Sequence, residues 1–160
     1  MLSQQALDQI DHEIEKYPAD QKQAAIMAIL MIAQREKGWL SNEVIDWVAG
    51  FLKIPKIRVR EVATFYSMFD LEPVGKRKIC VCTNISCMLL GSDQVIAHLE
   101  DRLGIAVGET TKDRRITLKE VECLGACGGA PMMQVGDSYC ENLTSEAIDV
   151  ILDQLEDGSA

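Results

Sequence analysis

Cysteine placement is the strongest constraint on how this 160-residue chain can fold. All six cysteines lie between Cys80 and Cys140, and the first 79 residues contain none. Four of the six form two pairs: Cys82 and Cys87 enclose four residues, Cys123 and Cys127 enclose three, and 35 residues separate the pairs. This asymmetry predicts two domains, with the cysteine chemistry confined to the second.

Composition narrows the class of protein. With 48% hydrophobic and 26% charged residues, the chain matches a soluble globular protein. Its net charge of -9, without a stripe of Lys and Arg, argues against nucleic-acid binding. The longest apolar run, residues 24–33, is half of the about 20 residues that a bilayer span needs, so we expect no direct membrane insertion.

The N-terminus shows no secretory signal, which predicts a cytoplasmic protein. In a reducing compartment six cysteines favour metal binding or redox chemistry over disulfides.

Residues 1–72 predict a small helical bundle, because apolar positions recur at helical spacing in four segments. We expect Asp20 to cap the second helix and Ser41 the third. Pro55 closes the third helix, and a fourth begins near Lys56.

Residues 73–160 predict a different pattern, in which short β-branched segments alternate with helices. The order is β-α-β-β-β-α, typical of an α/β or α+β layer domain. Its expected elements are strands at 78–82 and 115–121, a helix at 92–103, a hairpin around Gly136-Asp137 and a last helix capped by Thr144 or Ser145. The chain as a whole is therefore predicted to be α+β, a helical bundle followed by a cysteine-bearing domain.

The cysteine pairs favour a [2Fe-2S] cluster, because such a cluster needs two thiolates on each iron and each pair can supply one iron. Both pairs follow predicted strands, on loops expected at one end of the sheet. The cluster with its four thiolates is an anion, so it needs oriented donors. The glycines of the loop 125–131 allow backbone N–H groups to turn inward.

The residues alone leave other kinds of metal site possible. One structural zinc ion could be held by the same four cysteines, which would make the chain an interaction module without redox chemistry. The spacing differs from that of plant-type ferredoxins, and a Rieske site would need His12 and His98 near the cysteine loops. Cys80 and Cys140 are expected to be small buried hydrophobes.

Two more predictions concern the peptide bond before Pro131 and the aromatic residues of the helical bundle. The bond before Pro131 could be cis at a sharp turn. The helical bundle could dock a partner through Trp39, Phe65 and Tyr66, although each of these aromatics is more often a core residue.

The motifs carry a family resemblance. The segment Cys82-Thr-Asn-Ile-Ser-Cys87 with Gly91 after it, and the segment from Glu122 to Cys127 followed by Ala130-Pro131-Met132, are similar to the thioredoxin-like [2Fe-2S] ferredoxin family, and within it to the E subunits of bacterial NADH:quinone oxidoreductase, respiratory complex I. Residues 38–40 and 62–69 resemble the family too, so the likeness runs from about residue 10 to 155. One departure is Gly128-Gly129, where many relatives carry a bulkier or polar pair.

The resemblance implies a thioredoxin-like domain whose cluster ligands are Cys82, Cys87, Cys123 and Cys127. It implies an electron carrier with no catalytic residue and no substrate site of its own, working as part of a proton-translocating oxidoreductase. FMN and NADH would belong to a partner, the flavin- and NADH-binding subunit, and a large iron-sulfur subunit would be a second partner. The protein would then be peripheral on the cytoplasmic side of the inner membrane. Diaphorase modules of NAD-linked hydrogenases or formate dehydrogenases are the alternative parent complexes.

Overall fold

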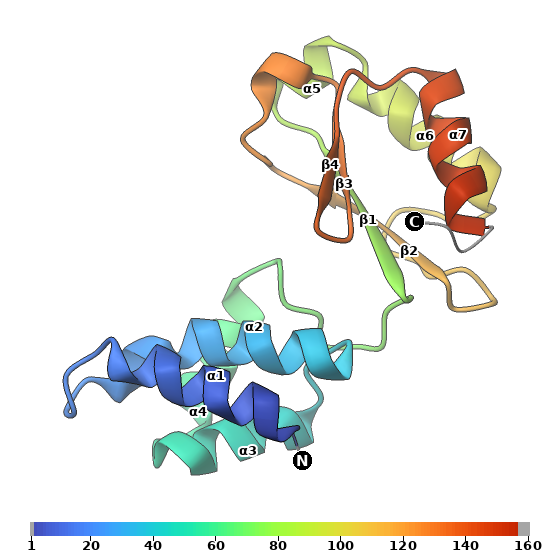
Figure 1. Ribbon diagram of the computed structural model, residues 1–160. Helices are drawn as coiled ribbons and strands as arrows, with labels where there is room; N and C mark the ends of the chain where they lie inside the picture. The colour runs from blue at the N-terminus through green and yellow to red at the C-terminus, as the bar shows by residue number, and fades with distance from the viewer. Residues whose placement is uncertain (1, 157–160) are drawn as a thin grey trace. The chain divides into compact units, whose positions relative to one another are not determined.

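The computed structural model describes residues 2–156 and divides into two compact units, Met1–Pro73 and Val74–Ala160 (Figure 1). The first is helical and the second is built around a sheet, so the protein is α+β as the sequence predicts. No helix within residues 2–156 has the length and apolarity needed to cross a membrane.

The helical unit consists of four α-helices and one 3-10 turn, η1. Their bounds are α1 (Gln4–Glu15), η1 (Lys22–Ala25), α2 (Ile26–Lys37), α3 (Asn42–Leu52) and α4 (Lys56–Phe65). Each α-helix turns an apolar face inward, and the fully buried side chains of the core include Ile10, Ile29, Leu30, Val48 and Val59. The unit thus has a hydrophobic core of its own.

Helix starts in this unit follow the sequence at α3 and differ at α2. The Ser41 hydroxyl accepts a hydrogen bond from the Val44 N–H and caps α3, as predicted. The prediction that Asp20 caps α2 is wrong. The segment instead begins with tight turns, in which Gln21 N–H donates to the Pro18 carbonyl and Ala24 N–H to the Gln21 carbonyl, and neither η1 nor α2 has a side-chain cap.

The second unit contains a four-stranded mixed sheet in the order β2-β1-β3-β4. Its strands are β1 (Arg77–Cys82), β2 (Ile116–Val121), β3 (Met133–Val135) and β4 (Ser138–Cys140). β1 and β2 are parallel, with Arg77 opposite Ile116 and Cys82 opposite Val121. β3 is antiparallel to both β1 and β4, and the predicted hairpin turns at Gly136.

Two helices, α6 (Ser92–Leu103) and α7 (Ser145–Glu156), complete the core of this unit. Val95 and Leu99 of α6 and Leu152 of α7 share one buried cluster with Ile79 and other strand residues. In β1, Ile79 and Val81 therefore face these helices, while Cys80 and Cys82 alternate to the other face of the sheet.

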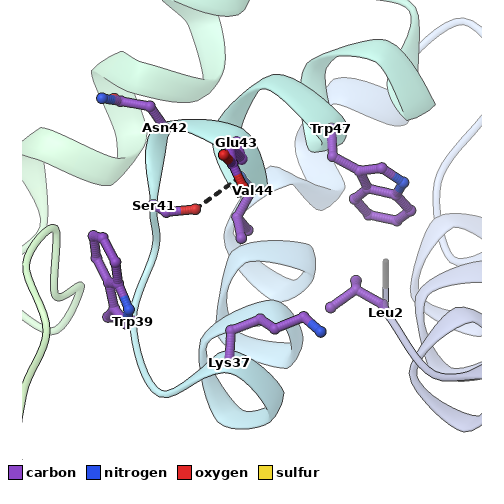
Figure 2. A pocket seen from close by; sticks show the side chains of 8 residues that line it. All are labelled: Leu2, Lys37, Trp39, Ser41, Asn42, Glu43, Val44 and Trp47. Carbon is purple, nitrogen blue, oxygen red and sulfur yellow. Dashed lines mark hydrogen bonds between the residues drawn. The ribbon is translucent and has the colours of Figure 1, made fainter.

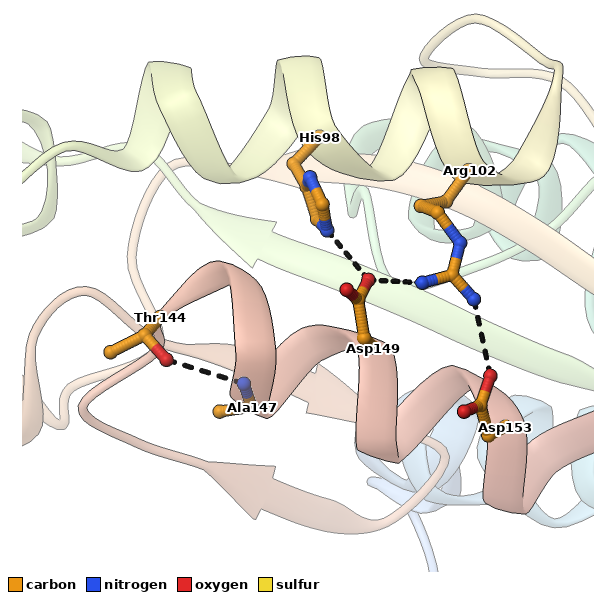
Figure 3. A network of polar contacts seen from close by, with 6 residues as sticks. All are labelled: His98, Arg102, Thr144, Ala147, Asp149 and Asp153. Carbon is orange, nitrogen blue, oxygen red and sulfur yellow. Dashed lines mark hydrogen bonds and ion pairs between the residues drawn. The ribbon is translucent and has the colours of Figure 1, made fainter.

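The two helices are also joined by polar contacts (Figure 3). Asp149 of α7 accepts from His98 Nε2 at 2.7 Å and from Arg102, both on α6, and Arg102 also donates to Asp153 at 3.1 Å. The Thr144 hydroxyl accepts from the Ala147 N–H and caps α7, as one of the two predicted caps.

Candidate metal-cluster site

The parallel pairing of β1 and β2 brings the predicted ligands to one edge of the sheet. Parallel strands end at the same edge, Cys82 is the last residue of β1, and Cys123 follows the end of β2 by two residues. Cys87 lies on a short helix, α5 (Ile85–Leu89), whose start is capped by the Asn84 side chain. Cys127 begins a 3-10 turn, η2 (Cys127–Gly129).

The thiols of the two pairs are neighbours. Cys82 lies within hydrogen-bond reach of both Cys87 and Cys123, and Cys87 interacts electrostatically with Cys127. Cys82 and Cys87 are buried, whereas Cys123 and Cys127 are exposed. Within residues 2–156, no three His, Cys, Asp or Glu side chains are placed as ligands of a single metal ion.

Backbone donors favour a negative sulfur at Cys82. Burial opposes its ionisation, but N–H groups of Asn84 and Leu124, with the thiols of Cys87 and Cys123, bring its pKa below the ordinary value. The pKa of Cys87 is raised by burial and by the adjacent Cys82 sulfur. A hydrogen bond from the Met132 N–H partly offsets this rise. Of the two buried thiols, Cys82 is therefore the one whose ionised form the backbone N–H groups favour.

The glycine-rich loop folds tightly against the segment that follows β4. Asn142 N–H donates to the Gly129 carbonyl at 2.7 Å, and Leu143 N–H donates to the Pro131 carbonyl at 3.0 Å. A Cβ on Gly129 would lie 2.6 Å from the Cβ of Glu141, so only glycine fits there. The Ala130-Pro131 bond is cis, the form that the sequence left open.

An apolar lining separates the buried cysteines from water. Met132 is 1% exposed and packs with Cys82 and Cys87, and Leu124, Ala126 and Ala130 border the same cluster. On the outside, α5 presents exposed apolar side chains beside Cys87, namely Ile85, Met88 and Leu89. The site is thus dry on one side and open on the other.

The remaining cysteines and histidines have other surroundings. Cys140 packs against the core of the second unit, and burial raises its pKa. Cys80 is half-buried on β1. His98 is engaged with Asp149 at the contact of α6 and α7, and His12 lies on α1 in the other unit.

Two features of the site are not apparent from the sequence. Helix α5 has five residues, too few for a helical period to be read, although Asn84 was a visible capping signal. The N–H donors of Leu124 and Asn84 are backbone groups, which no residue pattern identifies.

The helical unit holds a separate cavity of about 710 Å³ (Figure 2). Trp39 and Trp47 stand at opposite sides of it, and Lys37 extends its amine along the wall. The other lining residues are Leu2, Ser41, Asn42, Glu43 and Val44. Elsewhere in this unit Phe65 is 80% exposed, so the expectation that it belongs to the core is wrong. Helix α4 ends at this residue, and its ring contacts Tyr66 edge-on.

Comparison with known proteins identifies the family. The family described as thioredoxin-like [2Fe-2S] ferredoxin matches residues 10–156. The E subunit of NADH-quinone oxidoreductase from Rickettsia bellii is 48% identical over 143 residues, covering 89% of this chain and 86% of that protein. A second such protein, one of the E subunits of NADH-quinone oxidoreductase from Rhizobium meliloti, is 47% identical over 146 residues, with 91% and 86% covered.

A solved structure agrees with the fold. An NAD+-reducing [NiFe]-hydrogenase in the air-oxidised state superimposes with a TM-score of 0.74 at 19% identity, over 84% of this chain and 23% of the hydrogenase chain. The matched residues, the close relatives and the fold lead to one conclusion: the chain belongs to the thioredoxin-like [2Fe-2S] ferredoxin family.

Proposed function

We propose that Cys82, Cys87, Cys123 and Cys127 hold one [2Fe-2S] cluster, and that the chain carries single electrons as a subunit of an NADH-quinone oxidoreductase. The observation that carries this proposal is the position of Cys82, Cys87 and Cys123 beside one another at one end of the parallel β1–β2 pair. Cys127 interacts electrostatically with Cys87, and backbone N–H groups stabilise a negative sulfur at Cys82. The cysteine donor set fits the cluster of the family to which the chain belongs.

The bound cluster supplies a one-electron redox couple. The chain's own residues prepare its site: Asn84 and Leu124 direct N–H groups at the Cys82 sulfur, and Met132 directs one at Cys87 while its side chain excludes water. Hydrogen bonds to sulfur and partial burial are the means by which a protein sets a cluster's potential. The exposed Cys123 and Cys127 are the side from which electrons exchange with a partner.

Metal content tests the proposal against the zinc alternative. The purified protein is expected to contain two irons and two acid-labile sulfides per chain, and to give an electron paramagnetic resonance signal only after reduction. One zinc ion per chain, with no sulfide, would overturn it.

Cysteine substitutions test the ligand assignment. Each of Cys82→Ser, Cys87→Ser, Cys123→Ser and Cys127→Ser is expected to abolish the cluster or alter its visible spectrum strongly. Cys140→Ser is the matched control and should leave the spectrum unchanged, since its half-buried thiol packs against the hydrophobic core of the second unit. Cluster loss in the control would contradict the assignment.

The relatives' names support a multi-subunit setting, since two E subunits of NADH-quinone oxidoreductases are 48% and 47% identical to this chain. Within such an assembly we propose two partners, a flavin- and NADH-binding subunit that holds FMN and NADH and a large iron-sulfur subunit. We propose a peripheral position on the cytoplasmic side of the membrane. A diaphorase module of an NAD-linked hydrogenase is the second candidate, since such an enzyme shares the fold.

The helical unit is proposed to dock one of these partners through Phe65, which at 80% exposed is unusual for a large aromatic side chain. Phe65→Ser should reduce recovery of the assembled complex by affinity purification from the host. Tyr17→Ser, a partly exposed ring elsewhere in the same unit, is the control. Normal assembly of both variants would refute docking through Phe65.

A further inference from the structure

One tyrosine outside the ligand motifs touches the cluster loop. Tyr139 lies on β4, opposite Gln134 of β3, and its hydroxyl donates a 2.8 Å hydrogen bond to the carbonyl of Leu124. Leu124 lies between Cys123 and Cys127, in a segment that is neither helix nor strand. The Tyr139 side chain is half exposed, so core packing does not account for the position of its hydroxyl.

The two ends of Leu124 serve different partners. Its N–H is a backbone hydrogen-bond donor to the Cys82 sulfur, and its carbonyl accepts from the Tyr139 hydroxyl. The next residue, Gly125, has a φ of +76°, and a Cβ placed there would meet no atom within 4 Å. Packing at Gly125 therefore does not fix the loop. The hydrogen bond from the Tyr139 hydroxyl connects the loop to strand β4.

We propose that Tyr139 is a positioning residue that fixes the Leu124 N–H on the Cys82 sulfur and thereby raises the reduction potential of the cluster. The inference rests on the proposed cluster at these cysteines. Reduction adds a negative charge, so an N–H aimed at a ligand sulfur stabilises the reduced form more than the oxidised form. Without the hydroxyl, water can take its place on the carbonyl but cannot hold the loop to the strand.

The test compares Tyr139→Phe with the wild-type holoprotein in a redox titration followed by visible absorbance and electron paramagnetic resonance. The phenyl ring stays, so only the hydroxyl is lost. At a fixed applied potential, the ratio of oxidised to reduced cluster should rise about threefold in the variant. This corresponds to a reduction potential lower by roughly 30 mV for a one-electron couple. Tyr66→Phe, in the helical unit, is the matched control and should titrate as wild type.

The outcomes separate this inference from the proposed function. Two irons and two sulfides in the wild type with an unshifted Tyr139→Phe potential would overturn the positioning role and leave the cluster assignment standing. A Tyr139→Phe protein that cannot assemble the cluster would also overturn it, because the proposed role is fine placement of one donor. A wild type without iron would instead remove the proposed function on which the inference depends.

Discussion

Two adjacent glycines differ in what they do at the scale of the single residue. Gly129 lies against the Glu141 side chain, with no room for a Cβ, whereas a Cβ on Gly128 would meet nothing within 4 Å. The carbonyl of Gly129 also accepts from Asn142. The Gly128-Gly129 pair thus contains one glycine required by a close approach and one that the packing leaves unconstrained.

The substitution Gly129→Ala is accordingly expected to push apart the loop 127–131 and the segment after β4. The cluster should be released to an iron chelator several times faster than in the wild type, as followed by visible absorbance. Gly128→Ala should behave as wild type. Equal rates for Gly129→Ala and the wild type would show that Glu141 can move aside at no cost.

At the scale of elements, the sequence predicts most of this fold. β1, β2, α6 and the β3–β4 hairpin have clear periods, caps or turn residues, and the structure has them at nearly the predicted bounds. The prediction failed at two short segments that are too short to show a helical period. Helix α5 is about one turn long, and the 3-10 turn η1 stands where Asp20 was expected to cap a helix. The gathering of the cysteines could be anticipated because parallel strands end together, but the identity of the amide donors depends on loop geometry that no pattern encodes.

The contact between α6 and α7 allows a prediction at the same scale. Asp149 pairs with both His98 and Arg102, whereas Asp153 pairs with Arg102 alone (Figure 3). Asp149→Asn should therefore lower the thermal unfolding midpoint by a few degrees at most, as expected for exposed ion pairs. Asp153→Asn should lower it less. Circular dichroism at low and high salt measures both, and the difference should shrink as salt screens the charges.

The pH dependence of that contact has a definite sign. The hydrogen bond from His98 and the charge of Arg102 hold the pKa of Asp149 below its ordinary value of 3.8. A carboxyl group with a lowered pKa in the folded state stabilises the fold fully above its unfolded pKa, and loses that effect as the pH falls through the folded pKa. The difference between wild type and Asp149→Asn should thus be complete at neutral pH and decline below pH 3.8. A difference that grows in acid would contradict this assignment.

On the scale of the whole molecule, each of the two compact units has a hydrophobic core of its own among residues 2–156. One is built from residues between Leu2 and Phe69, the other from residues between Ile79 and Leu152. Leu30 is fully buried in the first core and Leu99 in the second. The stability of the helical unit and the integrity of the cluster site should therefore respond to different substitutions.

Two matched leucine-to-alanine substitutions, one in each core, test whether the two units unfold independently. Leu30→Ala should destabilise the helical unit by about 2–5 kcal/mol, the usual range for a buried leucine, while the cluster absorbance persists in denaturant as in the wild type. Leu99→Ala should cost a similar amount and release the cluster at lower denaturant. Cluster loss in both variants at the same denaturant concentration would show that the two units unfold together.

The parallel pairing of β1 with β2 also sets an order on the synthesis of the protein. Cys82 and Cys87 are synthesised before the 35 residues that separate the two pairs, and Cys123 takes its place only after residues 116–121 have aligned beside residues 77–82. Under the proposed ligand assignment, the early pair leaves the ribosome as one half of the site. Cluster insertion is then expected only after the long-range strand pairing has formed, and a nascent chain arrested before Cys123 should take up no iron-sulfur cofactor.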